Sequence, residues 1–368
     1  MNNSTTQQLD INNHEPPCSQ LVSTLFTVVL SIVSLAAFIG NILVIATFRK
    51  TPSLRTSTNY YLVNMAISDL LCGSFNWSLY ATEGMLTRRV FITEPMASVV
   101  CRLGMYFRGI SQVVSVLSLV LIAVDRYVAI VFPLKITVLR RKRVRLTLSL
   151  LTWIIPVASG LPYFLYTKIV KVNDQTFCRT MLSTSVNAIY NGVGFVLFYC
   201  TPLITMIILY SLSVKTLRKR SVTIGDRMQS QLNNKRQKQN QNIVKILISI
   251  VAGFFICWTP LCVYLALKMF HPALVARDNC MIFIGLFFYV FPSLSTAINP
   301  IILFLFSSNY RQALKSLSLH LCDIFKSRSF MHTSSNRIAS SQNENFDTIE
   351  LRYMSNRDTT CPRSTFDA

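Results

Sequence analysis

Residues 101–134 read CRLGMYFRGISQVVSVLSLVLIAVDRYVAIVFPL, a long apolar run that contains a few polar residues and the triplet Asp-Arg-Tyr. Arg108, Gln112, Ser115 and Arg126 recur at helical spacing, so on one helix they share a face. The two arginines would lie about 27 Å apart, close to the ~30 Å thickness of a hydrocarbon core. Ionisable groups are costly in lipid. We therefore expect a membrane-spanning helix whose polar face lies inside the protein and carries function.

The composition of the whole chain is that of a polytopic membrane protein. Of its 368 residues, 51% are hydrophobic and only 14% are charged, and the mean hydropathy is +0.43. A soluble domain carries roughly a quarter charged residues. Seven apolar blocks are each long enough to cross a membrane, at about 21–48, 58–85, 98–131, 146–167, 186–217, 240–269 and 279–306. The sequence predicts an all-α seven-transmembrane helix bundle.

The charge pattern predicts how this bundle is oriented. The net charge is +21, and the basic residues gather in the loops that follow the first, third and fifth blocks. Positively charged loops remain in the cytoplasm, so we expect an extracellular N-terminus, a cytoplasmic C-terminus and a plasma-membrane location, with no nucleic-acid partner. Residues 1–17 lack the features of a signal peptide, so the first span is expected to direct insertion.

Four regions are predicted along the chain. Residues 1–20 form a polar extracellular tail, in which Asn2 and Asn3 begin overlapping glycosylation motifs. Residues 21–306 form the seven-helix domain. Residues 307–322 are predicted to form an amphipathic eighth helix that contacts membrane lipids, with Cys322 as a lipidation site. Residues 323–368 are rich in polar side chains and are predicted to be a disordered cytoplasmic tail.

Short polar and proline-containing motifs follow one another through the seven blocks. They are Gly40-Asn41, Leu62–Asp69, Cys101 with Asp125-Arg126-Tyr127, Trp153, Pro202 with Tyr210, Phe254 with Cys257-Trp258-Thr259-Pro260, and Asn299-Pro300. This ordered set resembles the rhodopsin-like (class A) G-protein-coupled receptors, and neuropeptide-type receptors most of all. The resemblance covers residues 20–321. It implies a receptor without enzymatic activity that activates a heterotrimeric G protein through outward movement of helix six.

Asp69 places a carboxylate in the middle of the second block, where an isolated charge is costly. The side chains expected to converge on it are Asn41, Ser115, Ser295, Thr296 and Asn299. The resemblance implies that Asp69, Ser115, Ser295 and Asn299 hold an allosteric sodium ion in the inactive state. A hydrogen-bonded cluster without an ion is the alternative. No other cofactor is expected.

The same resemblance implies an activation switch. Its residues are Asp125, Arg126, Tyr127, Tyr210, Phe254, Trp258, Pro260 and Pro300. Pro260 and Pro300 each remove a helical hydrogen bond, which permits a kink or a hinge. Arg126 is expected to pair with Asp125 at rest and to contact the G protein when released, together with Leu134. One position departs from the family: Leu303 stands where relatives carry a tyrosine, which predicts a less stabilised active state or a different coupling geometry.

The resemblance also implies a disulfide between Cys101 and Cys178. A second bridge, between Cys18 and Cys280, is expected from its occurrence in some peptide and chemokine receptors. Before Cys178, residues 167–172 alternate like a strand, which resembles the outer-loop hairpin of many peptide receptors. We expect a hairpin here.

Residues of the predicted ligand site are Glu83, Arg108, Gln112, Tyr264 and Tyr289. Retinal is excluded because Ser293 stands at the position of the opsin lysine. An amine is disfavoured because Arg108 stands where amine receptors carry aspartate. Arg108 is expected to pair with either a ligand carboxylate or Glu83. Basic residues outnumber acids on the outer side, which favours an anionic ligand. A peptide is the leading class, and a small acidic metabolite or lipid is the alternative.

The sequence argues against two other protein classes and indicates further partners. A channel or transporter would show inverted repeats and paired broken helices, and the sequence shows no such pattern. An intramembrane enzyme would need a nucleophile motif or a metal cluster, and none is visible in the sequence. Serines and threonines of residues 323–368 are candidate targets for receptor kinases and hence for arrestin binding.

Overall fold

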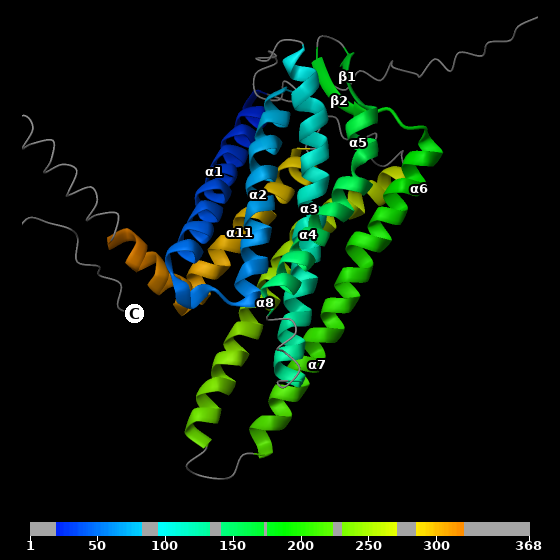
Figure 1. The fold of residues 1–368 in the computed structure, drawn as a ribbon. Coiled ribbons are helices and arrows are strands. Elements are labelled where there is room, and N and C mark those ends of the chain that lie inside the picture. Colours follow the sequence, from blue (N-terminus) through cyan, green and yellow to red (C-terminus); the bar gives the residue numbers. More distant parts are fainter. Residues whose placement is uncertain are drawn as a thin grey trace, which may run out of the picture. The chain divides into compact units, whose positions relative to one another are not determined.

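The computed structural model describes residues 20–82, 95–132, 141–172, 175–223, 230–270 and 285–319. The chain divides into two compact units, residues 1–310 and residues 311–368. Long helices lie side by side in the first unit (Figure 1). Its elements are α1 (Gln20–Lys50), η1 (Pro52–Leu54), α2 (Ser57–Thr82), α3 (Met96–Val131), α4 (Lys142–Ser159), α5 (Leu161–Tyr166), β1 (Thr167–Val172), β2 (Gln175–Thr180), α6 (Thr184–Phe195), η2 (Val196–Cys200), α7 (Thr201–Thr223), α8 (Ser230–Phe270), η3 (Gly285–Val290) and α11 (Phe291–Phe306).

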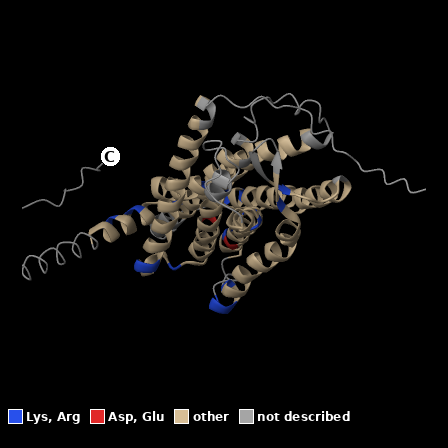
Figure 2. Cartoon of the chain, turned by 90° about the horizontal axis from the view of Figure 1, so that it is seen from above, with Lys and Arg blue, Asp and Glu red and all other residues tan. Residues whose placement is uncertain are grey.

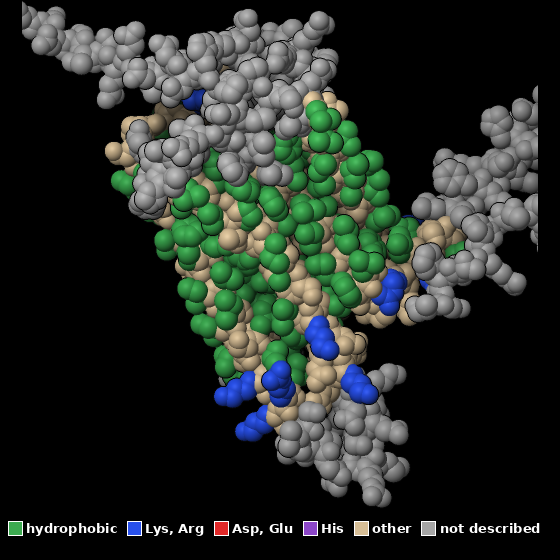
Figure 3. All heavy atoms as spheres, turned by 180° about the vertical axis from the view of Figure 1, so that it is seen from behind, with side chains coloured by type: hydrophobic (Ala, Val, Ile, Leu, Met, Phe, Trp, Pro, Cys, Tyr) green, Lys and Arg blue, Asp and Glu red, His purple; other side chains and the backbone are tan. Residues whose placement is uncertain are grey.

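The predicted helical fold is confirmed, because the described parts of all seven apolar blocks are helical, apart from a turn at Gly160 and the start of β1 at Thr167. Five described segments are long and apolar enough to span a membrane, and six if the bent pair Phe291–Phe306 and Ser308–Leu319 counts as one span. The five are Thr24–Lys50, Met96–Val131, Lys142–Tyr166, Ser185–Lys219 and Gln237–Leu267. Hydrophobic side chains cover the middle of the face seen in Figure 3, and basic side chains gather at one end.

Helix α3 is the centre of the first unit. In its most apolar stretch 56% of the residues are buried, compared with 11% in the span Ser185–Lys219. Helices α2, α4, α5, α7 and α8 all contact α3, and α1 packs against α2 and α11. Val114, Leu119 and Ile122 of α3 are fully buried. The only acids among the described residues, Asp69 and Asp125, lie inside the bundle (Figure 2).

Two π-helical turns precede prolines. The π turn η2 ends at Cys200, two residues before Pro202, and η3 ends at Val290, two residues before Pro292. A proline inside a helix lacks an N–H and its ring collides with the carbonyl four residues earlier. A wider turn at that carbonyl relieves the collision, and π turns are typically single insertions of this kind. Pro202 is one of the motif residues named from the sequence, but the sequence pattern did not predict the π turns.

The predicted hairpin is confirmed. Strands β1 and β2 pair antiparallel, with Ile169 opposite Cys178, and Cys178 forms the predicted disulfide with Cys101 of α3. Cys101, Cys178, Leu30 and Tyr289 form a buried cluster. This cluster joins the hairpin to α1, α3 and η3.

A helix at Ser308–Leu319 follows α11. Tyr310, Ala313 and Leu317, which share one face at helical spacing, are its buried residues. The predicted range 307–322 extends beyond the described residues, as do the tails at 1–20 and 323–368. These boundaries therefore stay predictions.

Candidate functional site

Asp69 is buried where α2, α3 and α11 meet. Ser115 Oγ of α3 donates a hydrogen bond to Asp69 Oδ1 at 3.0 Å, and Asn299 Nδ2 of α11 donates to Oδ2 at 3.0 Å. All three side chains are at most 4% exposed. A buried carboxylate needs such donors because its desolvation is otherwise uncompensated. The structure thus brings together three of the four residues predicted to hold sodium.

The other predicted members of this cluster have different partners. Ser295 Oγ accepts a hydrogen bond from Trp258 Nε1 of α8 at 3.1 Å and donates to the Pro292 carbonyl at 2.7 Å. Asn41 Nδ2 of α1 donates to the Thr296 carbonyl at 3.0 Å, and the Thr296 hydroxyl donates to the Ser293 carbonyl. These side chains therefore join α1 and α8 to α11 rather than bonding to Asp69.

The donor set around Asp69 fits a sodium ion. Asn299 Oδ1 is buried and has no hydrogen-bond partner among the described residues. Ser115 Oγ and the Asp69 carboxylate supply further oxygens within one bonded group. Hard cations prefer carboxylate, amide and hydroxyl oxygens. Asp69, Ser115 and Asn299 are the residues that would hold it.

The Asp-Arg-Tyr triplet lies near the end of α3. Arg126 Nη2 pairs with Asp125 Oδ2 at 2.6 Å and Arg126 Nε donates to the same oxygen at 3.1 Å. Thr58 Oγ1 of α2 also donates to Asp125 Oδ2, at 2.8 Å. Asp125 is buried, and the Arg126 side chain is 16% exposed. Tyr127 lies edge-on to Phe132. The arginine is thus held against α3 by an anchored carboxylate.

Aromatic side chains fill the middle of α8. Phe254 and Trp258 are buried, with ring centroids 5.9 Å apart, and Pro260 lies two residues beyond Trp258. Tyr210 of α7 is buried, and its hydroxyl has no hydrogen-bond partner among the described residues. Leu303 is buried in α11, near Pro300 in sequence. Trp258 is the contact that couples α8 to the polar network through Ser295.

Arg108 lies two helical turns along α3 from Cys101 and is buried. Its guanidinium carbon is 5.6 Å from the centre of the Tyr289 ring, a distance typical of a cation–π contact. Tyr264 is buried with its ring 6.0 Å from that of Phe287, and Gln112 is half-buried. Two of the predicted ligand residues, Arg108 and Tyr289, are therefore in contact.

Sequence reasoning missed a second polar network. Asn64 Nδ2 donates to Ser118 Oγ at 2.9 Å and to Thr152 Oγ1 at 3.0 Å, and its Oδ1 accepts from Trp153 Nε1 at 2.9 Å. It joins α2 to α3 and α4. The available signal was that polar side chains inside apolar blocks must find partners across helices. Thr58 carried the same signal.

Several predicted site residues lie outside the described residues and stay predictions. They are Glu83, Leu134, Cys18, Cys280, Asn2, Asn3 and Cys322.

Comparison with known proteins gives one family. Residues 40–303 match the family model described as 7 transmembrane receptor (rhodopsin family). The chain is 30% identical over 346 residues to a tachykinin-like peptides receptor 86C of Drosophila melanogaster, covering 88% of this chain and 66% of that protein. It is 29% identical over 296 residues to the neuromedin-K receptor of Rattus norvegicus, covering 79% and 62%. A GQ-coupled rhodopsin of Mizuhopecten yessoensis is 27% identical over 269 residues, covering 70% and 53%. The chain thus spans just under two thirds, or less, of these relatives' lengths.

Proposed function

Because the chain belongs to the seven-transmembrane receptors of the rhodopsin family, we propose that it binds an extracellular peptide and activates a heterotrimeric G protein. The family consists of non-enzymatic, multi-pass membrane proteins. The observation that carries the peptide proposal is the Arg108–Tyr289 contact close to the hairpin that Cys101 and Cys178 anchor. An arginine at this depth can recognise a carboxylate, and the hairpin provides backbone groups for an extended chain.

The relatives support a peptide over the other ligand classes. A tachykinin-like peptides receptor and the neuromedin-K receptor are among them. The rhodopsin relative does not favour retinal as the ligand of this chain, because Ser293 stands where opsins carry the lysine that binds retinal. We assign the ligand contacts to Arg108, Gln112, Tyr264, Tyr289 and, by prediction, Glu83. A small acidic metabolite or lipid at Arg108 is the second candidate, favoured by the same guanidinium.

Activation follows from which contacts would break. The ligand contributes only its preference for the state in which α8 has swung outward. A shift from 1:99 to 99:1 requires about 5.5 kcal/mol of such preference. In that state Arg126 leaves Asp125 and contacts the G protein, with Leu134 beside it. The Trp258–Ser295 hydrogen bond is one described contact between α8 and α11 that this motion would strain.

Sodium would act on the opposite state. A sodium ion held by Asp69, Ser115 and Asn299 would tie α2, α3 and α11 together and stabilise the resting arrangement. Its test needs no signalling. The purified receptor should unfold at a higher temperature in sodium than in potassium, and Asp69→Asn should abolish the difference. Equal unfolding temperatures of the unaltered receptor in both salts would contradict the assignment.

The proposed orientation is an extracellular N-terminus in the plasma membrane. Its support is that the end of α1, the start of α4 and the end of α7 all carry basic residues: Arg49, Lys50, Arg141, Lys142, Arg143, Arg145, Lys215, Arg218 and Lys219. These element ends alternate along the chain, so they belong on one side, as the positive-inside rule requires. Kinases and arrestin are proposed partners of residues 323–368.

The test is signalling in cells that express the full chain. Calcium and cyclic AMP are followed while tissue extract is added with and without protease pretreatment. A response that proteolysis removes, and that Arg126→Ala abolishes at equal surface expression, is the expected result. Arg108→Ala should weaken the response strongly, and Arg108→Lys should retain part of it because the charge remains. A response that survives proteolysis would replace the peptide with the small acidic ligand.

A further inference from the structure

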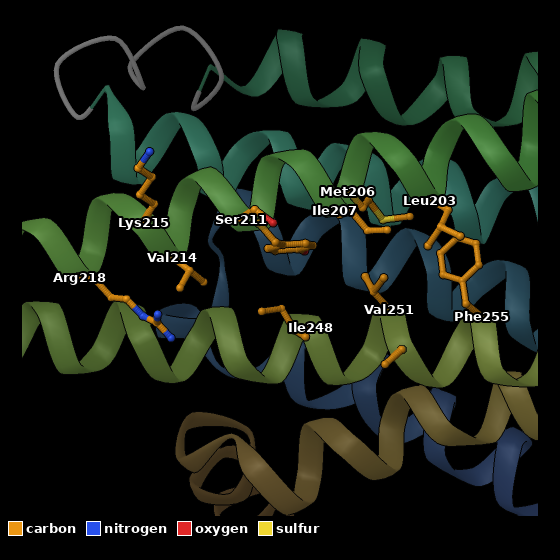
Figure 4. A pocket seen from close by; sticks show the side chains of 12 residues that line it. Leu203, Met206, Ile207, Ser211, Val214, Lys215, Arg218, Ile248, Val251 and Phe255 are labelled. Atoms are coloured by element: carbon orange, nitrogen blue, oxygen red, sulfur yellow. The ribbon is translucent and has the colours of Figure 1, made fainter.

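A pocket of about 650 Å³ lies between α7 and α8. One stripe of each helix lines it, at the three- and four-residue steps of a helical face. In Figure 4 the side chains of Val214 and Arg218 on α7 and of Ile248 and Val251 on α8 point into this space, whereas Lys215 points away from α8. Its volume falls in the range of about 300–1,000 Å³ that is typical of ligand sites. The pocket contains none of the proposed peptide or sodium residues.

Hydrogen bonds near the two ends of the pocket join α8 to α7 and to the π turn η2 that precedes α7. Near one end, Tyr199 Oη lies 2.6 Å from Thr259 Oγ1. Near the other, Gln237 Nε2 donates to the Leu217 carbonyl at 2.9 Å. Between these contacts the pocket lies in the groove that the two helices form. Ile207 is 57% and Ile248 is 39% exposed, so the pocket opens toward the outside of the bundle, where lipid lies.

The lining changes character along the pocket. Leu203 and Phe255 lie at one end, and Lys215 and Arg218 lie at the other (Figure 4). From Leu203 to Lys215 the helix rises about 18 Å, close to half of a ~30 Å hydrocarbon core. The pocket thus has an apolar part about as long as one leaflet and two cations at one end. This shape and charge complement an acyl chain that carries an anionic head group.

We propose that this pocket binds an anionic phospholipid of the cytoplasmic leaflet. One acyl chain lies along Ile207, Val214 and Ile248, and the phosphate group pairs with Lys215 and Arg218. Both cations are exposed, and they belong to the end of the chain's helices where basic residues gather. The choice of leaflet rests on the orientation proposed above. The pocket and its charge do not depend on that orientation or on the ligand of the receptor.

The test is photo-crosslinking of the purified full chain in nanodiscs. A phosphatidylserine with a photoreactive group in one acyl chain is mixed into phosphatidylcholine, and labelled peptides are mapped by mass spectrometry. Labels should concentrate on residues 203–214 and 248–255. The same photoreactive acyl chain on phosphatidylcholine should label these residues at least tenfold less, because each basic group contributes roughly a fivefold preference for an anionic lipid.

Two pairs of variants make the test specific. Lys215→Ala with Arg218→Ala should reduce phosphatidylserine labelling to the phosphatidylcholine level. Lys142→Ala with Arg143→Ala, which removes two exposed cations at the start of α4, should leave it unchanged. Ala252→Trp fills the pocket and should abolish labelling there, while Ala36→Trp on the exposed face of α1 should not.

The readout is a covalent label, so it is independent of signalling. Labels spread evenly over α1, α4 and α7 would overturn the proposal, as would equal labelling by the two lipids. If Ala252→Trp lowers the unfolding temperature, the proposal is judged only by the double variant Lys215→Ala with Arg218→Ala and its control on α4. Loss of labelling with the α4 control variant would show only general surface attraction and would also overturn the site.

Discussion

Two regions of the bundle are held together in different ways. Where α2, α3 and α11 meet, buried polar side chains cross-link the helices: Asp69 to Ser115 and Asn299, and Asn64 to Ser118. Between α7 and α8, the described hydrogen bonds lie near the ends of a lipid-facing pocket, and the lining between them is mainly apolar. Directional bonds define one arrangement of the first region. Apolar contacts leave the second region free to adopt more than one arrangement of its helices.

This difference suits the proposed activation, in which α8 moves while the other helices keep their arrangement. Packed helices switch between discrete arrangements, and the element that moves is drawn from the less stable part of a protein. We call the first region, where α2, α3 and α11 meet, the frame. In the proposed activation, the pocket between α7 and α8 lies on the side of the bundle where the helices move. Three substitutions test this difference between the two regions.

The largest effect is expected from Gly40→Ala. A Cβ at Gly40 of α1 would lie 2.7 and 2.9 Å from the Cγ and Cβ atoms of Pro300, whose ring cannot rotate away. Overpacking costs about 1–3 kcal/mol, and the rigid ring places this clash at about the upper value. Gly194→Ala on α6 is the matched control, since a Cβ there meets nothing within 4 Å. Thermal unfolding, followed with a dye that reacts with buried thiols such as Cys72 and Cys257, should separate the two. Equal unfolding temperatures would mean that the frame is not tightly packed.

An intermediate effect is expected from Asn64→Ala. The change removes three hydrogen bonds that join α2 to α3 and α4. Inter-helical bonds in membranes average about 0.6 kcal/mol each, so the loss should be about 2 kcal/mol.

The control for Asn64→Ala is Thr205→Ala. The Thr205 hydroxyl donates only to the Thr201 carbonyl of its own helix, so this change should alter the unfolding temperature little. A larger drop for Thr205→Ala than for Asn64→Ala would reverse the comparison between the two regions.

The smallest effect is expected from Leu303→Tyr. It supplies a hydroxyl that Tyr210 of α7 would meet through water in the active state. One such hydrogen bond is worth about 1 kcal/mol, so basal signalling should rise about fivefold. Leu303→Phe, which adds the ring without the hydroxyl, is the control, and adding Tyr210→Phe should cancel the gain. Unchanged basal and maximal signalling in Leu303→Tyr would show that Leu303 does not limit the active state.

Sequence reasoning reached the parts of the molecule that one helix and one buried charge determine. Asp69 had to be partnered in a membrane, and candidate donors were few, so Ser115 and Asn299 could be named. The strand at 167–172 followed from its alternation, and the pair Asp125–Arg126 from the resemblance to the receptor family.

What depended on helix rotation and spacing was not predictable. Ser295 was expected near Asp69, but its hydroxyl bonds to Trp258. The Asn64 network and the pocket between α7 and α8 need the distances between neighbouring helices, which periodicity within one helix does not contain. The π turns shift the helical faces by amounts that the seven apolar blocks do not reveal.

The π turn before Pro202 has a consequence for comparing this chain with its relatives. One extra residue in a helical turn rotates everything before it by about 100°. Residues of α6 therefore face different neighbours than an uninterrupted helix through Pro202 would give them. Consider an alignment that starts at Pro202 and continues toward α6 without a gap, to a relative that lacks the π turn. Such an alignment is wrong by one position for each residue of α6, including Tyr190 and Asn191. Residue roles in the outer half of this span should be transferred between relatives by structure rather than by counting from the proline.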